Sequence, residues 1–90
     1  MGTHRFIVRG RVQGVGFRYF ALNAARRFGI TGTVRNMADG SVEAIAQGSD
    51  DAVAGFQAEL ERGPSYGHVD SVHESLIEES RAYTRFDVVY

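Results

Sequence analysis

The spacing of apolar side chains changes abruptly at the short loop of residues 13–16. In residues 4–12, apolar and polar positions alternate, which is typical of a strand with one face in a core. In residues 17–28, apolar positions recur at the spacing of an amphipathic helix, and Gly29 follows where that helix is expected to end. A strand that turns through a glycine-rich loop into a helix is therefore the first unit that the sequence predicts.

The rest of the chain repeats these two patterns. Further strands are expected at residues 30–36, 41–48, 69–77 and 86–90. Asp39 and Gly40 form a tight-turn signal between the first two of these strands, and a bulge is expected in the third. Ser49 is expected to cap a second helix that ends at Gly63.

The order of these elements limits the fold. We predict one domain over residues 1–90, in the α+β class, with βαββαβ order and a short terminal strand. Two helices on one mainly antiparallel sheet form a two-layer sandwich, the ferredoxin-like arrangement. In that arrangement we expect the first two strands to be neighbours.

Charge is divided unevenly along the chain. Residues 1–38 contain seven arginines and no acidic residue, whereas residues 39–90 contain all eleven acidic residues and three arginines. One interpretation is that the basic half folds against the acidic half. The other is a positive field around an anion site. The two are compatible, and the sequence does not choose between them.

Several classes of protein are disfavoured by composition. The chain has no cysteine, so a disulfide framework, a thiolate metal site and a cysteine nucleophile are excluded. Its three histidines lack ligand spacing, and we expect neither a metal nor a cofactor. No apolar run approaches the ~18 residues of a membrane span. We therefore expect a cytoplasmic, monomeric protein without membrane or nucleic-acid partners.

The first predicted helix opens with a cation, although a helix N-terminus favours an anion. The unpaired N–H groups of a first turn carry positive partial charge, and Arg18 adds to it with no acidic residue nearby. An anion from outside the chain, held between those N–H groups and the guanidinium, would explain the position of Arg18. Gly14 and Gly16 would let the backbone approach it closely. In the alternative interpretation the glycines only turn the chain, and Arg18 points into solvent.

Two stretches of sequence, together with their separation, resemble the acylphosphatases. They are GRVQGVGFR at residues 10–18 and GTVRNMADGSVEAIAQG at residues 32–48. GPSYGHV at residues 63–69 is a less close match, and Thr33 and Ser65 depart from the family pattern. The resemblance implies a ferredoxin-like fold and hydrolysis of the carboxyl–phosphate bond of small-molecule acyl phosphates. The products are a carboxylate and inorganic phosphate, and no metal or cofactor takes part.

The same resemblance implies roles for particular residues. Arg18 and the backbone N–H groups of the loop are expected to bind the phosphoryl group, and Asn36 is expected to position the attacking water. The N–H groups belong to Gln13, Gly14, Val15, Gly16, Phe17 and Arg18. The side chain of Gln13 is expected to support the loop rather than to react. Inorganic phosphate or sulfate is expected to bind at the same place, as product or inhibitor.

Other interpretations of these residues remain open. Asn36 precedes a tight turn, where asparagine commonly bonds the nearby backbone, and Tyr19 is expected to pack rather than to border a cleft. A regulatory anion-sensing domain without turnover would need the same loop. An RNA-binding module of this fold is disfavoured, because the outward face of the first predicted strand carries no aromatic ring.

Overall fold

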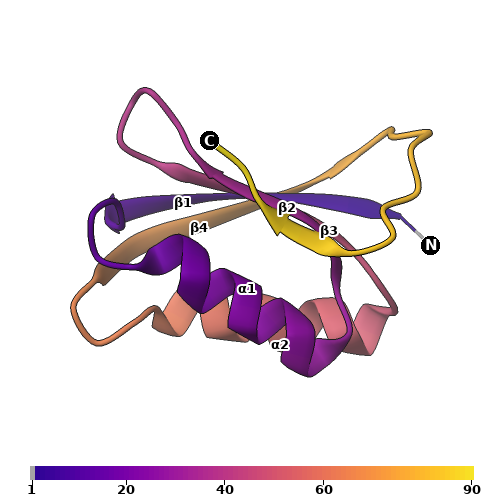
Figure 1. Cartoon of the computed structure of the whole chain (residues 1–90), viewed down its shortest axis with the longest axis horizontal. Coiled ribbons are helices and arrows are strands. Elements are labelled where there is room, and N and C mark those ends of the chain that lie inside the picture. The colour runs from indigo at the N-terminus through magenta and orange to yellow at the C-terminus, as the bar shows by residue number, and fades with distance from the viewer. Residues whose placement is uncertain (1) are drawn as a thin grey trace.

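Five strands and two helices make up the computed structural model, which describes residues 2–90. The elements are β1 (Thr3–Arg11), α1 (Phe17–Phe28), β2 (Thr31–Asn36), β3 (Val42–Gln47), α2 (Asp50–Arg62), β4 (His68–Ile77) and β5 (Phe86–Val88). Both helices lie against the same face of the sheet, and the opposite face is open (Figure 1). The predicted order and the two-layer arrangement are confirmed.

The sheet is mainly antiparallel, as predicted, with strand order β4-β1-β3-β2-β5. Only β5 and β2 pair in parallel among the described strands. The register of β1 against β4 shifts between Arg9 and Gly10, so the expected bulge is present. These pairings fix where the ends of β1 and β2 lie, and both ends take part in the site described below.

The expectation that the first two strands are neighbours is wrong. β3 lies between β1 and β2 and pairs antiparallel with both. The reason is that the tight turn after β2 sends the chain straight back as β3, while the crossover through α1 leaves a gap of one strand between β1 and β2. The ends of β1 and β2 that are nearest the start of α1 therefore point in the same direction, on either side of β3.

The core lies between the sheet and the two helices. Phe56 of α2 is fully buried, and its ring meets Phe6 of β1 and Phe86 of β5 edge to face, at centroid distances of 6.0 and 5.7 Å. Phe17, the first residue of α1, is 1% exposed. The start of α1 is thus anchored in the core, directly beside Arg18.

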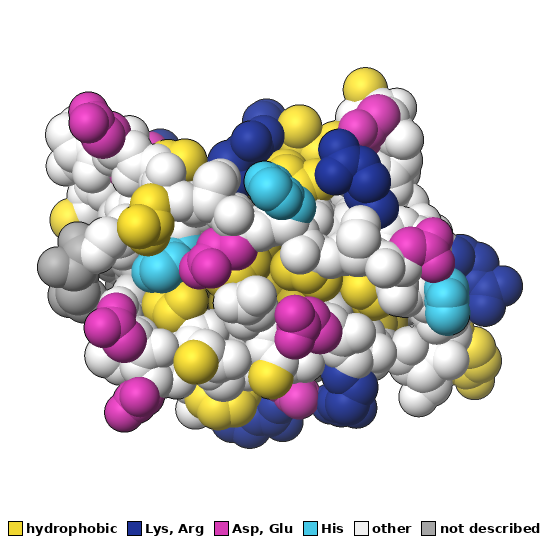
Figure 2. Space-filling view, turned by 180° about the vertical axis from the view of Figure 1, so that it is seen from behind, with side chains coloured by type: hydrophobic (Ala, Val, Ile, Leu, Met, Phe, Trp, Pro, Cys, Tyr) yellow, Lys and Arg dark blue, Asp and Glu magenta, His cyan; other side chains and the backbone are white. Residues whose placement is uncertain are grey.

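Ion pairs join the basic half of the chain to the acidic half, as one of the two interpretations predicted. Glu43 of β3 is 7% exposed, and its carboxylate accepts hydrogen bonds from Arg5 at 2.7 Å and Arg35 at 3.0 Å. Arg27 of α1 bonds Glu59 of α2. Basic and acidic side chains accordingly intermingle over the face in Figure 2 instead of separating into two regions.

Glu59 is held by a second arginine from its own helix. Its carboxylate accepts hydrogen bonds from Arg62 and from Arg27, and these lower its pKa to about 2. The cluster therefore connects the two helices through a carboxylate that stays ionised well into the acid range.

Within residues 2–90, neither helix has the length and apolar character that crossing a bilayer requires.

Candidate functional site

The N-terminus of α1 has no side-chain cap. Gly16 occupies the capping position with φ of 77°, and the first turn contains no acidic residue. The start of α2 is different, because Ser49 accepts a hydrogen bond from the N–H of Ala52 at 3.2 Å, and Asp50 and Asp51 follow it. The two helices share one sheet face, yet only α1 leaves its first N–H groups without a side-chain partner among residues 2–90. An uncapped helix start favours an anion.

The two loop glycines adopt the left-handed conformation that the anion interpretation required. Gly14 has φ of 74° and Gly16 has φ of 77°, and a Cβ atom at either position would meet nothing within 4 Å. The backbone conformation, and not crowding, therefore calls for glycine at both. The space beside them is open to a ligand.

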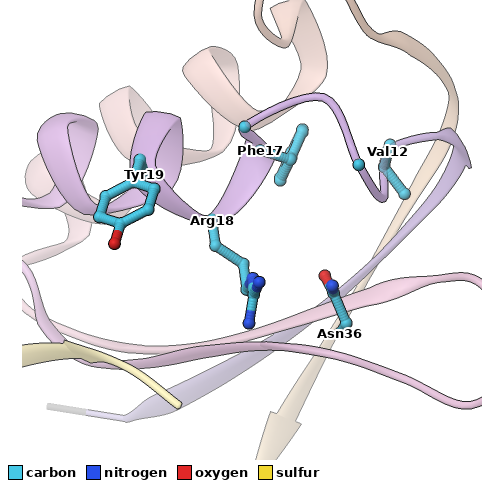
Figure 3. Close-up of a pocket in the computed structure, with 7 residues that line it drawn as sticks. Val12, Phe17, Arg18, Tyr19 and Asn36 are labelled. Atoms are coloured by element: carbon cyan, nitrogen blue, oxygen red, sulfur yellow. The ribbon is translucent and has the colours of Figure 1, made fainter. Parts of the chain in front are cut away.

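A hollow of about 150 Å³ lies between this loop and the end of β2. It is lined by Val12, Gly14, Gly16, Phe17, Arg18, Tyr19 and Asn36. Arg18 reaches into the hollow from α1, and Asn36 reaches toward it from β2 (Figure 3). The structure thus brings together the two side chains to which the sequence assigned the chemistry. Gln13 and Val15, also in the predicted set, do not line the hollow.

The lining of the hollow is positively charged. Arg18 is its only charged side chain, and no carboxylate within residues 2–90 pairs with that guanidinium. Its neighbour is instead the ring of Tyr90, whose centroid lies 4.4 Å from Cζ of Arg18. A contact of this kind uses no N–H donor of the guanidinium in a hydrogen bond, so the donors remain available to an oxyanion.

Two tyrosines flank Arg18. The neighbouring phenol of Tyr90 raises the pKa of Tyr19. Tyr19 is 60% exposed and lines the hollow, so the expectation that it packs is wrong. Its place in the first turn of α1, next to Arg18, was the signal for this position. No local signal pointed to Tyr90, because β5 carries it to the site by pairing with β2.

The side chain of Asn36 has no hydrogen-bond partner among residues 2–90, and the residue is exposed at the end of β2. The following turn is held by other groups. Asp39 Oδ1 accepts hydrogen bonds from the N–H and the hydroxyl of Ser41, at 3.0 and 2.5 Å, and these lower the pKa of Asp39. The alternative interpretation, in which Asn36 braces the turn, therefore has no support in the structure.

Gln13 supports the turn after β2. Its side-chain Nε2 donates to the carbonyl of Met37 at 2.7 Å and to that of Ser41 at 2.9 Å. Both hydrogens of the amide thus bond backbone carbonyls of the turn, which agrees with the supporting role expected for this side chain.

The arrangement offers donors for an oxyanion and one amide for a small polar molecule. No group of three or more histidine, cysteine, aspartate or glutamate side chains in the described part of the chain is placed to hold a metal ion. The donors are the first N–H groups of α1, the Arg18 guanidinium and the Asn36 amide, which donates and accepts.

Comparison with known proteins gives a consistent result. The family model described as Acylphosphatase matches residues 4–88. Acylphosphatase from Pasteurella multocida is 46% identical over 86 residues, which is 96% of each chain. The crystal structure of acylphosphatase from Bacillus subtilis superposes with a TM-score of 0.95 at 37% identity over the whole of both chains. The structure of an acylphosphatase from Coxiella burnetii gives 0.91 at 32% identity, over 98% of this chain and 92% of the other.

Proposed function

Because the chain belongs to the acylphosphatase family, we propose that it hydrolyses the carboxyl–phosphate bond of acyl phosphates to a carboxylate and inorganic phosphate. The observation that carries the proposal is the uncapped start of α1, where Arg18 has no carboxylate partner within residues 2–90 and shares one hollow with Asn36. This arrangement is suited to a phosphoryl group.

The phosphoryl group binds at the start of α1. Its oxygens accept hydrogen bonds from the N–H groups of residues 13–18 and from the guanidinium of Arg18. The N–H groups of Gln13 and Val15 contribute least, because these two residues do not line the hollow. The helix N-terminus contributes positive partial charge, and a guanidinium meets two phosphoryl oxygens at once. Both interactions grow stronger as charge builds on the peripheral oxygens in the transition state.

The attacking water is held by Asn36. The amide oxygen accepts one proton of the water in a hydrogen bond, which aims a lone pair of the water at phosphorus. Phosphoryl transfer passes through a loose transition state, so the water needs little activation. The leaving group is a carboxylate, a weak base, and requires no general acid. A phosphoryl oxygen accepts the proton of the water, which leaves inorganic phosphate.

The test is hydrolysis of benzoyl phosphate by the purified chain, with and without excess EDTA. We expect turnover in both conditions, competitive inhibition by inorganic phosphate, and weaker inhibition by sulfate at the same place. Loss of activity in EDTA that a divalent ion restores would refute the metal-free mechanism. Absence of turnover in a folded protein would refute the function.

Arg18 provides the second test. Arg18→Ala is expected to abolish both phosphate inhibition and turnover. Arg18→Lys is expected to restore little, because an ammonium cannot form the two-pronged contact. Arg26→Ala is the matched control, since Arg26 is exposed in the last turn of the same helix. Equal loss in both alanine variants would indicate a general charge effect.

A further inference from the structure

The side-chain amide of Gln13 connects the two halves of the candidate site. Gln13 directly precedes Gly14 of the hollow, and Met37, whose carbonyl it bonds, directly follows Asn36. The second bond reaches the carbonyl of Ser41, on the other side of the same turn. The two hydrogen bonds therefore link the loop that leads to Arg18 with the turn that carries Asn36.

The carbonyls of Met37 and Ser41 lie at the two ends of the turn. The N–H of Met37 donates to Ser41 O at 2.8 Å, and the N–H of Gly40 donates to Met37 O at 3.1 Å. Each carbonyl thus has one backbone donor already, and the two hydrogens of the Gln13 amide take the remaining acceptor positions. The reverse orientation of the amide would set its oxygen against two carbonyl oxygens, so the hydrogen-bond network assigns the orientation.

The two halves of the site differ in how firmly they are held. The Arg18 side is fixed by Phe17, which is 1% exposed in the core. The turn after Asn36 is exposed from Ala38 to Gly40. Within the described chain, the Gln13 amide donates the side-chain hydrogen bonds that reach this turn from another element, and Arg9 of β1 adds a longer ion pair, with its Nη2 3.9 Å from Asp39 Oδ2. A change at Gln13 therefore moves the turn and leaves the start of α1 in place.

We propose that Gln13 is a positioning residue for Asn36. Through its two hydrogen bonds it sets the separation between the Asn36 amide and the Arg18 guanidinium, and so the place of the attacking water relative to the phosphoryl group. The inference rests on the proposed function and deepens it. The side chain of Gln13 therefore acts on the turn that follows Asn36, and through that turn on the amide that positions the water.

The test compares Gln13→Met and Gln13→Ala with Gln47→Ala. Methionine keeps the length and bulk of glutamine but donates no hydrogen bond. Gln47 also donates two hydrogen bonds, to Thr3 and to the Arg81 carbonyl, at the far end of β3. We expect both Gln13 variants to lose about 10- to 100-fold in kcat, the scale expected for a misplaced reacting group. The inhibition constant of inorganic phosphate should change less than about twofold, since Arg18 and the helix start remain.

The Gln13 variants and Gln47→Ala should all lose stability, whereas only the Gln13 variants should lose kcat. Gln13→Ala should lower Tm by roughly 4–24 °C, from the loss of two hydrogen bonds of ordinary strength. Gln47→Ala should lower Tm by at least as much, because the Gln47 side chain also accepts a hydrogen bond from the N–H of Tyr83. Amide exchange at Met37 and Gly40 should quicken in the Gln13 variants alone. Full activity in Gln13→Met, or an equal kcat loss in Gln47→Ala, would overturn the inference.

A double variant settles whether Gln13 acts through Asn36. In the Asn36→Ala background, Gln13→Met should cause no further fall in kcat, because no amide is left to place. Independent, multiplicative losses would overturn the inference, as would a rise in the phosphate inhibition constant that matches the fall in kcat. An inactive parent chain would instead overturn the proposed function itself. A fully active parent with unaffected Gln13 variants would overturn only the role of Gln13.

Discussion

Removal of the Asn36 amide should separate catalysis from binding and from stability. The side chain has no hydrogen-bond partner among residues 2–90 and is exposed, while Asp39 and Gln13 hold the turn that follows it. Asn36→Ala should therefore change the free energy of unfolding by no more than about 0.5 kcal/mol, as at other exposed positions. For a domain of this size, that corresponds to a change in Tm of at most about 4 °C.

The expected effect on turnover is much larger. Loss of one positioned polar group from a phosphoryl- or acyl-transfer site lowers kcat by about 10²–10³, or roughly 2.7–4 kcal/mol of transition-state stabilisation. The phosphate inhibition constant should stay within about twofold, because the N–H groups and Arg18 are untouched. The expected loss of transition-state stabilisation is thus at least about five times the expected change in the free energy of unfolding.

The assay follows benzoyl phosphate hydrolysis for kcat and KM, phosphate inhibition for binding, and thermal unfolding for stability. Asn23→Ala is the matched control, since Asn23 is an exposed asparagine on α1. A turn-bracing residue would lower Tm and leave kcat near normal, and a phosphate ligand would raise KM and the inhibition constant together. Parental kcat in folded Asn36→Ala would refute the role of Asn36 and leave Arg18 as the one catalytic side chain.

Four further outcomes follow from the geometry. Inorganic phosphate should raise Tm with concentration, by an increment that tracks its inhibition constant, and calorimetric titration showing no binding would contradict this. Gly16→Ala should lower Tm by roughly 4–16 °C in thermal unfolding, because alanine resists a φ of 77°; an unchanged Tm would show that the loop relaxes. Tyr90→Leu should weaken phosphate inhibition about two- to fivefold by freeing Arg18, while Tyr90→Phe keeps the stacked ring and the parental value. The pKa of Glu59 falls from 4.5 to about 2 on folding, so the stability that its carboxylate contributes is complete above pH 4.5 and is lost as the pH falls toward 2. Glu59→Gln should therefore flatten the dependence of Tm on pH between these values. Parallel Tm curves for the parent and the variant would show that the cluster of Glu59 with Arg27 and Arg62 does not stabilise the fold.

The sequence predicted the parts of the fold that depend on neighbouring residues. The change of period at residues 13–16 located β1 and α1, and Asp39 with Gly40 located the turn between β2 and β3. The uncapped helix start and the unusual place of Arg18 were also visible, since capping involves residues close together in the chain. These are the signals that local periodicity and capping preferences carry.

The remaining features depend on which segments meet in space. Alternation shows which side chains face the core but not which strands pair, so the position of β3 between β1 and β2 was missed. The contact of Tyr90 with Arg18 required the parallel pairing of β5 with β2. The bonds from Gln13 to Met37 required knowing that the two loops adjoin. In each case the contacting residues lie far apart in the sequence, and no local sequence pattern predicts that they meet.

The pairing of β1 with β4 sets a condition on biosynthesis. β1 pairs along residues 3–11 with residues 68–77, so one side of a central strand finds its partner only when most of the chain exists. Closing so long a loop carries an entropic cost before any contact offsets it, and sheets of this kind fold more slowly than helical bundles. Translation at ~5–20 residues per second thus leaves β1 with a bare edge for several seconds. The loop, Arg18 and Asn36 therefore all leave the ribosome before the strand that completes the pairing of β1.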